Sequence, residues 1–255
     1  MATKYARIGS RIALLAAGSL ALVGLTGAPG YAADDAEVYI VQGLPGKTLD
    51  IAVDGKTVAS DVKTAAVVGP FQVEGGSRKV TFRDGENVVL ERMFEVKAKS
   101  SWDVVVHLPA STKTDPAVTV FRNDLTTVPR GKAELTVAHT AAVPPADIRV
   151  NGKVLFADVA NGESLNLTVP VATYKVAIVP AGAAKPVYLG PLSLTVKGGA
   201  LNRVYALGDP EKKTMNVAVH VIATGSTGSS RPSRVDTGTG GQAVGSSPSL
   251  MTLWR

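Results

Sequence analysis

The feature that most constrains the fold is an internal repeat. Residues 50–56 (DIAVDGK) return as residues 147–153 (DIRVNGK), 97 positions later, and this offset holds without a gap over residues 37–62. A chain that contains one segment twice is built from two copies of one module. The residues that are identical in both copies are Glu37/Glu134, Asp50/Asp147, Ile51/Ile148, Val53/Val150, Gly55/Gly152, Lys56/Lys153, Asp61/Asp158 and Val62/Val159.

The modules themselves have the pattern of β-strands. Short runs rich in Val, Ile, Leu, Thr and Tyr alternate with Gly, Pro, Asn and Asp, which is typical of an all-β sandwich or barrel. Both copies carry a two-residue hairpin signal, Asp54-Gly55 and Asn151-Gly152, because a type I′ turn needs positive φ at both central positions. The expected strands are 38–41, 49–53, 67–73, 79–83, 88–96, 102–108 and 118–121, then 135–138, 148–150, 165–169, 174–179, 192–196, 204–207 and 217–222.

We therefore expect an all-β fold of two tandem immunoglobulin-like or prealbumin-like antiparallel β-sandwich modules. They occupy residues 36–124 and 133–222, and a short linker joins them with limited independence. No helical periodicity of useful length occurs anywhere in the two modules.

The N-terminus predicts export. Lys4, Arg7 and Arg11 precede an uncharged apolar run at 12–25, and small residues close the run before an acidic pair, which is the order of a secretory signal peptide. We expect a signal peptide at 1–32 that is cleaved after Ala32. An uncleaved membrane anchor is the alternative, but the run is short for spanning a bilayer.

The C-terminal segment 223–255 predicts a disordered tail. Gly, Ser, Thr and Pro make up most of it, and such a composition buries too little apolar surface to offset its ordering entropy. Thr237-Gly238 matches the pair that sortases cut but lacks the preceding Leu-Pro, so display on the cell wall is an alternative to a plain flexible tail. The last six residues are too few to cross a membrane, and no integral span is expected in the mature chain.

Composition excludes several classes of protein. The chain contains no Cys, so disulfides, thiolate metal sites and cysteine nucleophiles are excluded. Its formal net charge is +6, of which three charges lie in the expected signal peptide, and the remaining cations are not clustered. Nucleic-acid binding needs clustered Lys and Arg, so we expect no nucleic-acid partner.

No constellation of residues predicts catalysis, and we expect no enzyme activity. His107, His139 and His220 lack metal-ligand spacing, so we interpret them as strand-end histidines and expect no metal site. Residues 60–63 spell Ser-x-x-Lys, but that pair needs one turn of a buried helix. Residues 238–243 fit a loose dinucleotide fingerprint without a strand before or a helix after it, so no cofactor is expected.

The repeated carboxylates Asp50/Asp147 and Asp61/Asp158 have two interpretations. Paired acids could cleave a glycoside if they faced each other across a cleft. An Asp kept in both copies more simply accepts backbone N–H bonds near a loop, and we prefer this structural role. The aromatic residues of the modules are expected in the core, which leaves no catalytic or binding residue to assign.

The second module resembles a known family. Residues 133–140 (AELTVAHT) and 145–153 (PADIRVNGK), with later matches at 169–176 and 205–208, resemble the DUF4397 family. The resemblance covers about 36–222 and is closest in the second module. It implies exported, mostly bacterial β-sandwich modules of unestablished function, and it brings no catalytic residues. The family's His corresponds to His139, whereas the first module has Gln42 there.

The sequence therefore predicts a secreted, non-catalytic structural or binding protein of the cell envelope or extracellular space, whose partner is a protein or a cell-wall polymer. A carbohydrate-binding or wall-polymer-binding module is one alternative, and it requires aromatic side chains in an outward row. A hydrolase is another, and it requires a pocket with two converging acids or a His–Asp pair. A PEGA-type surface module, which shares the Asp-Gly-Lys hairpin, would differ in strand count.

Overall fold

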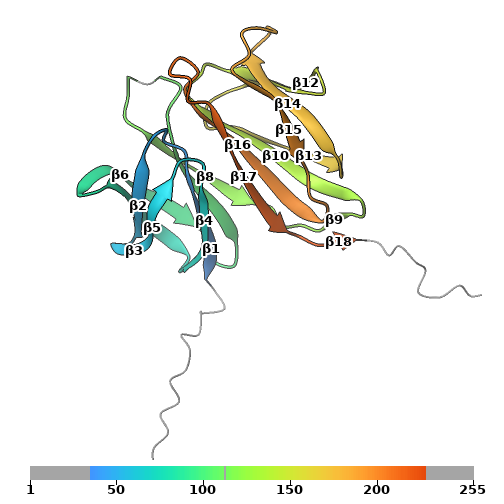
Figure 1. The fold of residues 1–255 in the computed structure, drawn as a ribbon. Helices are drawn as coiled ribbons and strands as arrows, with labels where there is room; N and C mark the ends of the chain where they lie inside the picture. Colours follow the sequence, from blue (N-terminus) through green and yellow to red (C-terminus); the bar gives the residue numbers. More distant parts are fainter. Residues whose placement is uncertain (1–34, 112, 228–255) are drawn as a thin grey trace, which may run out of the picture. The chain divides into compact units, whose positions relative to one another are not determined.

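The computed structural model describes residues 35–111 and 113–227 of the 255-residue chain (Figure 1). All regular secondary structure in these residues is β-strand, and 18 strands follow one another along the chain. The expected all-β class is confirmed. The expected signal peptide and the part of the expected tail beyond Thr227, including Thr237 and residues 238–243, lie outside the described residues.

Module 1 consists of the first eight strands, which form two four-stranded sheets. We call the sheet of order β4-β1-β7-β8 its inner sheet and the sheet of order β3-β2-β5-β6 its outer sheet. The strands are β1 (Ala36–Gln42), β2 (Thr48–Val53), β3 (Lys56–Lys63), β4 (Val67–Val73), β5 (Gly76–Asp84), β6 (Asn87–Val96), β7 (Ser101–His107) and β8 (Ala117–Asn123).

Module 2 repeats the same plan strand for strand. Its inner sheet has the order β13-β10-β16-β17 and its outer sheet the order β12-β11-β14-β15. The strands are β10 (Lys132–Ala141), β11 (Ala146–Val150), β12 (Lys153–Val159), β13 (Ser164–Pro170), β14 (Thr173–Pro180), β15 (Leu189–Thr195), β16 (Ala200–Gly208) and β17 (Asn216–Ala223). The repeat found in the sequence is thus a repeat of topology.

Strand pairing is antiparallel within both modules except for one pair in each. β1 runs parallel to β7, and β10 runs parallel to β16. In these ladders Tyr39 pairs with Asp103, and Thr136, which lies 97 positions after Tyr39, pairs with Arg203. Asp103 and Arg203 therefore occupy the same site in the two modules.

The hairpin turns have the expected geometry. Asp54 and Gly55 have φ of 48° and 81°, and Asn151 and Gly152 have φ of 51° and 82°. Positive φ at both central residues is the type I′ requirement, so the turn prediction is confirmed.

The four repeated aspartates form one backbone clamp, used twice. The N–H of Asp61 donates to Asp50 Oδ1 at 3.0 Å, and the N–H of Asp158 donates to Asp147 Oδ1, also at 3.0 Å. Asp61 and Asp158 have φ of 54° and 56°, where β3 and β12 shift register against β2 and β11. The expected structural role is confirmed for the carboxylates of Asp50 and Asp147, whereas Asp61 and Asp158 take part through their backbone N–H groups.

Each module encloses its own apolar core between its two sheets. The core of module 1 contains Ile40, Ile51, Phe82 and Val104, and that of module 2 contains Leu135, Ile148, Val176 and Val204. Burying one such side chain contributes about 1.5–3 kcal/mol. The cores therefore stabilise both modules without disulfides.

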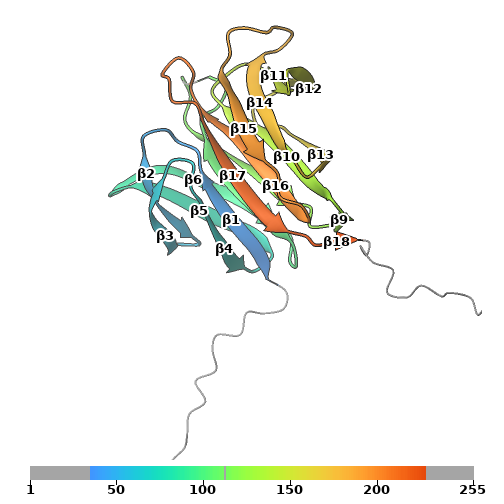
Figure 2. The same ribbon diagram turned by 45° about the vertical axis from the view of Figure 1, so that its right-hand side comes forward.

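The two inner sheets also pack against each other. All nine residues of β16 are buried, which is not expected for a sheet with one face in solvent. A further apolar cluster joins the modules, and its members are Val41, Val105, Phe121, Ala138, Tyr205, Leu207 and Ala218. The sheets are thus layered outer, inner, inner, outer, and Figures 1 and 2 show the strands of the two inner sheets between the outer ones.

The linker is anchored rather than free. Its β9 (Val128–Pro129) pairs in parallel with β18 (Ser226–Thr227). The start of the expected disordered tail is therefore wrong for residues 223–227, since Ala223 completes the β16–β17 ladder and Ser226-Thr227 pair with the linker. These residues have few apolar side chains to bury, and backbone hydrogen bonds hold them in place instead.

Candidate functional site

The three histidines do not converge on one site. His107 on β7 is 1 % exposed, and its Nδ1 lies 2.8 Å from Leu108 O while Nε2 lies 2.8 Å from Thr119 Oγ1. Burial lowers the pKa of His107 below its ordinary value, and the neighbouring His139 lowers it further. No group of three metal-binding side chains occurs among the residues that the structure describes.

His139 closes a loop, as its counterpart Gln42 does in module 1. His139 Nδ1 accepts the N–H of Ala141 at 3.4 Å, and Nε2 lies 3.3 Å from Pro144 O. Gln42 Nε2 donates to Leu44 O at 3.1 Å and to Lys47 O at 2.8 Å. Burial lowers the pKa of His139, which favours the neutral ring that this geometry needs.

A cluster of buried polar side chains lies between the two inner sheets, and we call it the joint cluster. Its members are Asp103 on β7, Asn123 on β8, Arg203 and Tyr205 on β16, and His220 on β17. All five side chains are buried, and Asp103 is fully enclosed.

Asp103 is the centre of the joint cluster. Its carboxylate accepts the Asn123 amide at 2.7 Å and the Tyr205 hydroxyl at 2.5 Å. The Nδ1 atom of His220 lies 2.9 Å from the same carboxylate. Two of these three groups come from module 2, so a single carboxylate of module 1 ties β7 and β8 to β16 and β17 across the joint.

Arg203 extends the joint cluster from the other side. Its Nε donates to Asn123 Oδ1 at 3.1 Å and lies 3.9 Å from Asp103 Oδ2, and its guanidinium donates to Arg122 O at 2.7 Å. The guanidinium also lies over the Phe121 ring, 5.5 Å from its centroid. The buried cation is thus held by an anion, an amide, a carbonyl and a ring.

Burial controls the chemistry of Tyr205. Desolvation and the nearby Asp103 carboxylate raise the pKa of Tyr205 well above its ordinary value of 10.0. The tyrosine therefore stays a neutral hydrogen-bond donor and is no proton acceptor at physiological pH.

Asp103 and His220 form a His–Asp pair, the kind that the hydrolase alternative requires in a pocket. Catalysis would need the second ring nitrogen of His220 to face a nucleophile beside space for a substrate. Instead the Tyr39 ring packs on His220 with centroids 4.2 Å apart. Neither of the two cavities described next is lined by the pair.

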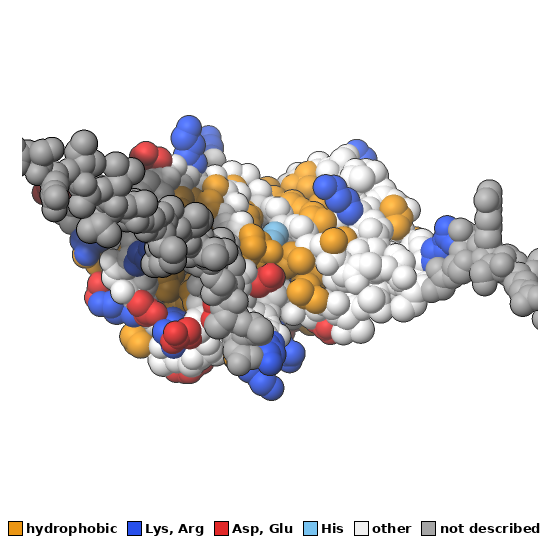
Figure 3. Space-filling view, turned by 90° about the horizontal axis from the view of Figure 1, so that it is seen from below, with side chains coloured by type: hydrophobic (Ala, Val, Ile, Leu, Met, Phe, Trp, Pro, Cys, Tyr) orange, Lys and Arg blue, Asp and Glu red, His pale blue; other side chains and the backbone are white. Residues whose placement is uncertain are grey.

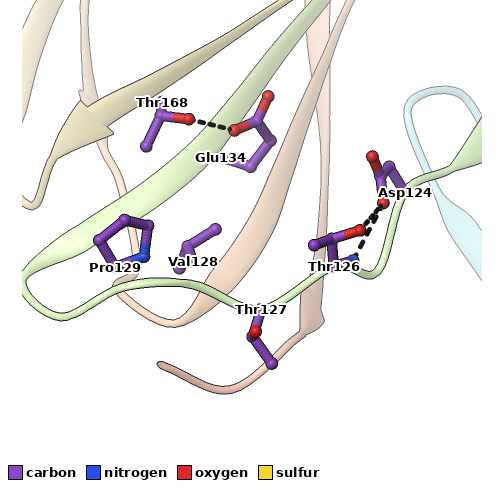
Figure 4. Close-up of a pocket in the computed structure, with 7 residues that line it drawn as sticks. All are labelled: Asp124, Thr126, Thr127, Val128, Pro129, Glu134 and Thr168. Atoms are coloured by element: carbon purple, nitrogen blue, oxygen red, sulfur yellow. Dashed lines mark hydrogen bonds between the residues drawn. The ribbon is translucent and has the colours of Figure 1, made fainter. Parts of the chain in front are cut away.

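One cavity, of about 210 Å³, lies between the linker and the edge of the inner sheet of module 2 (Figure 4). Figure 4 shows Glu134 bonded to Thr168 on one side and Asp124 bonded to Thr126 on the other, with Val128 and Pro129 below. The two bonds from Thr126 lower the pKa of Asp124. This hydroxyl-lined and carboxylate-lined hollow, the linker cavity, suits a small polar ligand.

The second cavity is a void of about 10 Å³ inside module 2, lined by core side chains such as Val137 and Leu192. It has room for about one water molecule and is too small for an organic ligand.

The remaining sequence candidates are not brought together. Ser60 and Lys63 lie exposed on the strand β3, so they do not share a helical turn. The aromatic side chains of the modules are all buried or half-buried, so they form no outward row. They are Tyr39, Phe71, Phe82, Phe94, Trp102, Phe121, Phe156, Tyr174, Tyr188 and Tyr205.

Comparison with protein families gives a match over residues 36–146 to the family described as "Domain of unknown function (DUF4397)". Residues 36–146 are therefore similar to a DUF4397 domain. The matched stretch covers module 1 and β10, so the match falls mainly on the first repeat, whereas the sequence resemblance was closest in the second. No curated protein matches the chain.

A solved structure was also found, described as "a putative cell adhesion protein from Bacteroides eggerthii DSM 20697". It shares 9 % identity, covers 74 % of this chain and 96 % of that one, and has a TM-score of 0.17. So low a score carries no argument about this protein. No helix in the described residues is long and apolar enough to cross a bilayer.

Sequence reasoning missed the joint cluster, although signals for it exist. Asp103 and Arg203 are each followed by a run that is apolar on both faces, 104–106 and 204–207, which is typical of a strand with a covered sheet on either side. A charge in such a strand needs a buried partner.

Proposed function

We propose that the protein is an exported, non-catalytic structural or binding protein of the cell envelope or extracellular space, and that its two modules act as one rigid body. One observation carries the proposal. The side chains best suited to acid, base or nucleophilic work are used to hold the fold: Asp103 and His220 in the joint cluster, Asp50 and Asp147 in the backbone clamps.

Rigidity follows from the joint. The inner sheets share an apolar cluster as well as buried hydrogen bonds, and removing either partner of a buried ion pair costs about 3–5 kcal/mol. A rigid body of two modules presents its outer sheets and loops at fixed positions, which suits a spacer or a display platform.

Export rests on the N-terminal sequence pattern, which is typical of a cleaved signal peptide. On the face shown in Figure 3, basic side chains lie in separate groups rather than in one patch, which supports a partner other than nucleic acid.

The test is fractionation of native cells into medium, wall and membrane, followed by intact-mass measurement. We expect a free chain that begins near Ala33 and ends at Arg255. A cytoplasmic, unprocessed chain would contradict the proposal. Loss of mass at Thr237, with release only after wall digestion, would establish the sortase-displayed alternative.

Carbohydrate or wall-polymer binding is the second candidate, and the linker cavity is the observation that favours it. Carboxylate and hydroxyl groups such as Glu134 and Thr168 bind sugar hydroxyls, although the aromatic side chains of the modules form no outward row. A glycan array with the wild-type chain and Glu134→Gln tests it. Binding that Glu134→Gln abolishes supports the candidate, and an array without binding contradicts it.

A further inference from the structure

The modules meet through equivalent surfaces. Asp103 and Arg203 occupy the same strand site, and across the neighbouring ladders Asp103 pairs with Phe121 as Arg203 pairs with His220. Phe121 and His220 are therefore equivalent too. These four residues all lie in the joint between the inner sheets.

The same cross-contact occurs twice with the modules exchanged. Asp103 of module 1 contacts His220 of module 2 at 2.9 Å, and Arg203 of module 2 lies over Phe121 of module 1 at 5.5 Å. A contact between sites i and j that is matched by one between j and i is the signature of an isologous, two-fold interface. The joint is built like the interface of a symmetric dimer, but inside one chain.

We propose that Asp103 and Arg203 give this interface its partner specificity, so that the face of each module fits a module carrying the opposite charge at the equivalent site. Module 1 thus pairs with module 2 and rejects a second copy of module 1, and module 2 likewise rejects its own copy.

The argument is electrostatic. Asp103 is 0 % exposed and Arg203 is 3 % exposed, so the joint removes both charges from water. In a pairing of like modules, the two-fold arrangement would bring two buried carboxylates or two buried guanidiniums together. Uncompensated buried charges are strongly unfavourable, and such repulsion is how interfaces exclude wrong partners.

A purely local role for Asp103 is the competing explanation. The carboxylate also accepts bonds from Asn123, Tyr205 and His220, and those bonds alone could account for its burial. The two explanations differ in what happens when Arg203 is replaced by an anion.

The test uses the full chain with Arg203→Glu, Asp103→Asn and both together, and it follows the midpoint of thermal unfolding at pH 7.5. Alone, Asp103→Asn should lower the midpoint by about 10 °C, because the buried cation loses its anion. In the Arg203→Glu background the same Asp103→Asn should raise the midpoint, because it removes one of two like charges. Arg203→Gln is the control, since Gln matches Glu in size without its charge.

A fall in the midpoint on adding Asp103→Asn to Arg203→Glu would overturn the proposal and favour the local role. Equal midpoints for Arg203→Glu and Arg203→Gln would also overturn it. If Arg203→Glu does not fold, the cycle of Asp103→Asn with Arg203→Gln decides. If the falls in midpoint of the two single variants add up to that of the double variant, the proposal is contradicted. A double variant whose midpoint falls by less than this sum would support it.

Discussion

Module 1 and module 2 share one topology, and their identical and different residues have different tasks. The residues kept in both copies, such as Asp50/Asp147 and Gly55/Gly152, form clamps and turns inside each module. Several residues that differ at equivalent sites, above all Asp103 and Arg203, lie in the joint. Repetition preserves what each module needs to fold, and divergence supplies what the modules need to bind each other.

This division can be tested by replacing residues with their own repeat counterparts. The counterpart residue already fits the same site in the other module. The exchange should therefore lower the free energy of unfolding strongly only where the residue takes part in the joint. An exposed exchange, Thr57→Val, which copies Val154 into module 1, is the common control and should be nearly neutral.

The largest effect is expected for Asp103→Arg, which copies the residue of module 2 into module 1. Two buried guanidiniums would then face each other, and the joint cluster would lose its carboxylate. The free energy of unfolding should fall by about 5 kcal/mol. Chemical denaturation followed by circular dichroism measures it. A loss no larger than that of Thr57→Val would show that Asp103 does not hold the joint.

Tyr205→Val comes next, since Val105 is its counterpart in module 1. The change removes a fully buried ring and the hydroxyl that donates to Asp103. We expect a loss of about 3 kcal/mol in the free energy of unfolding. Tyr205→Phe, which keeps the ring, should lose less. Equal losses for the two variants would mean that the ring contributes nothing to the joint.

Much of the fold was predictable because short local patterns in the sequence determine its strands and turns. Alternation in residues 49–53 predicts β2, and the pairs Asp54-Gly55 and Asn151-Gly152 predict the turns that follow β2 and β11. The edge strands β3 and β12 were missed. They are largely exposed and shift register at a bulge, so no hydrophobic alternation marks them.

The joint was less predictable because it depends on residues far apart in the chain. Asp103 and His220 are 117 positions apart, and neither the repeat nor a motif connects them. The three valines 104–106 of β7 indicate a strand covered on both faces, but they do not say by what. The role of His139 in closing a loop became clear only by comparison with Gln42.

The turn glycines should show that the two modules respond alike where their residues are identical. Gly55→Ala and Gly152→Ala should each cost about 1 kcal/mol, because φ is 81° and 82°, where a residue with a Cβ is strained. Apart from the chain neighbours, no atom lies within 4 Å of an added Cβ, so steric contact adds nothing to this loss. Thermal unfolding of both variants measures this loss. A silent substitution at either glycine would contradict the strain argument, and a much larger loss at one would break the equivalence of the modules.

The smallest effect at neutral pH is expected for His139→Gln, which copies Gln42 into module 2. Gln can close the loop as it does in module 1, so the free energy of unfolding at pH 7.5 should change by less than about 1 kcal/mol. His139→Ala, which leaves the Ala141 N–H without its acceptor, is the matched variant and should lose more.

Acidic pH should distinguish His139 from a Gln at the same position. Burial lowers the pKa of His107 and of His139 from 6.5 in the folded state, so the unfolded chain binds more protons at acidic pH. The stability that the neutral rings contribute is complete above pH 6.5 and is lost as the pH falls through 6.5 towards the folded pKa values. His139→Gln removes one of the two groups, so its unfolding midpoint should fall less than that of the wild type between pH 7.5 and pH 5. Equal falls of the two unfolding midpoints would mean that His139 has the same pKa in the folded and the unfolded chain. The difference between Gln42 and His139 would then have no effect on how the modules respond to acid.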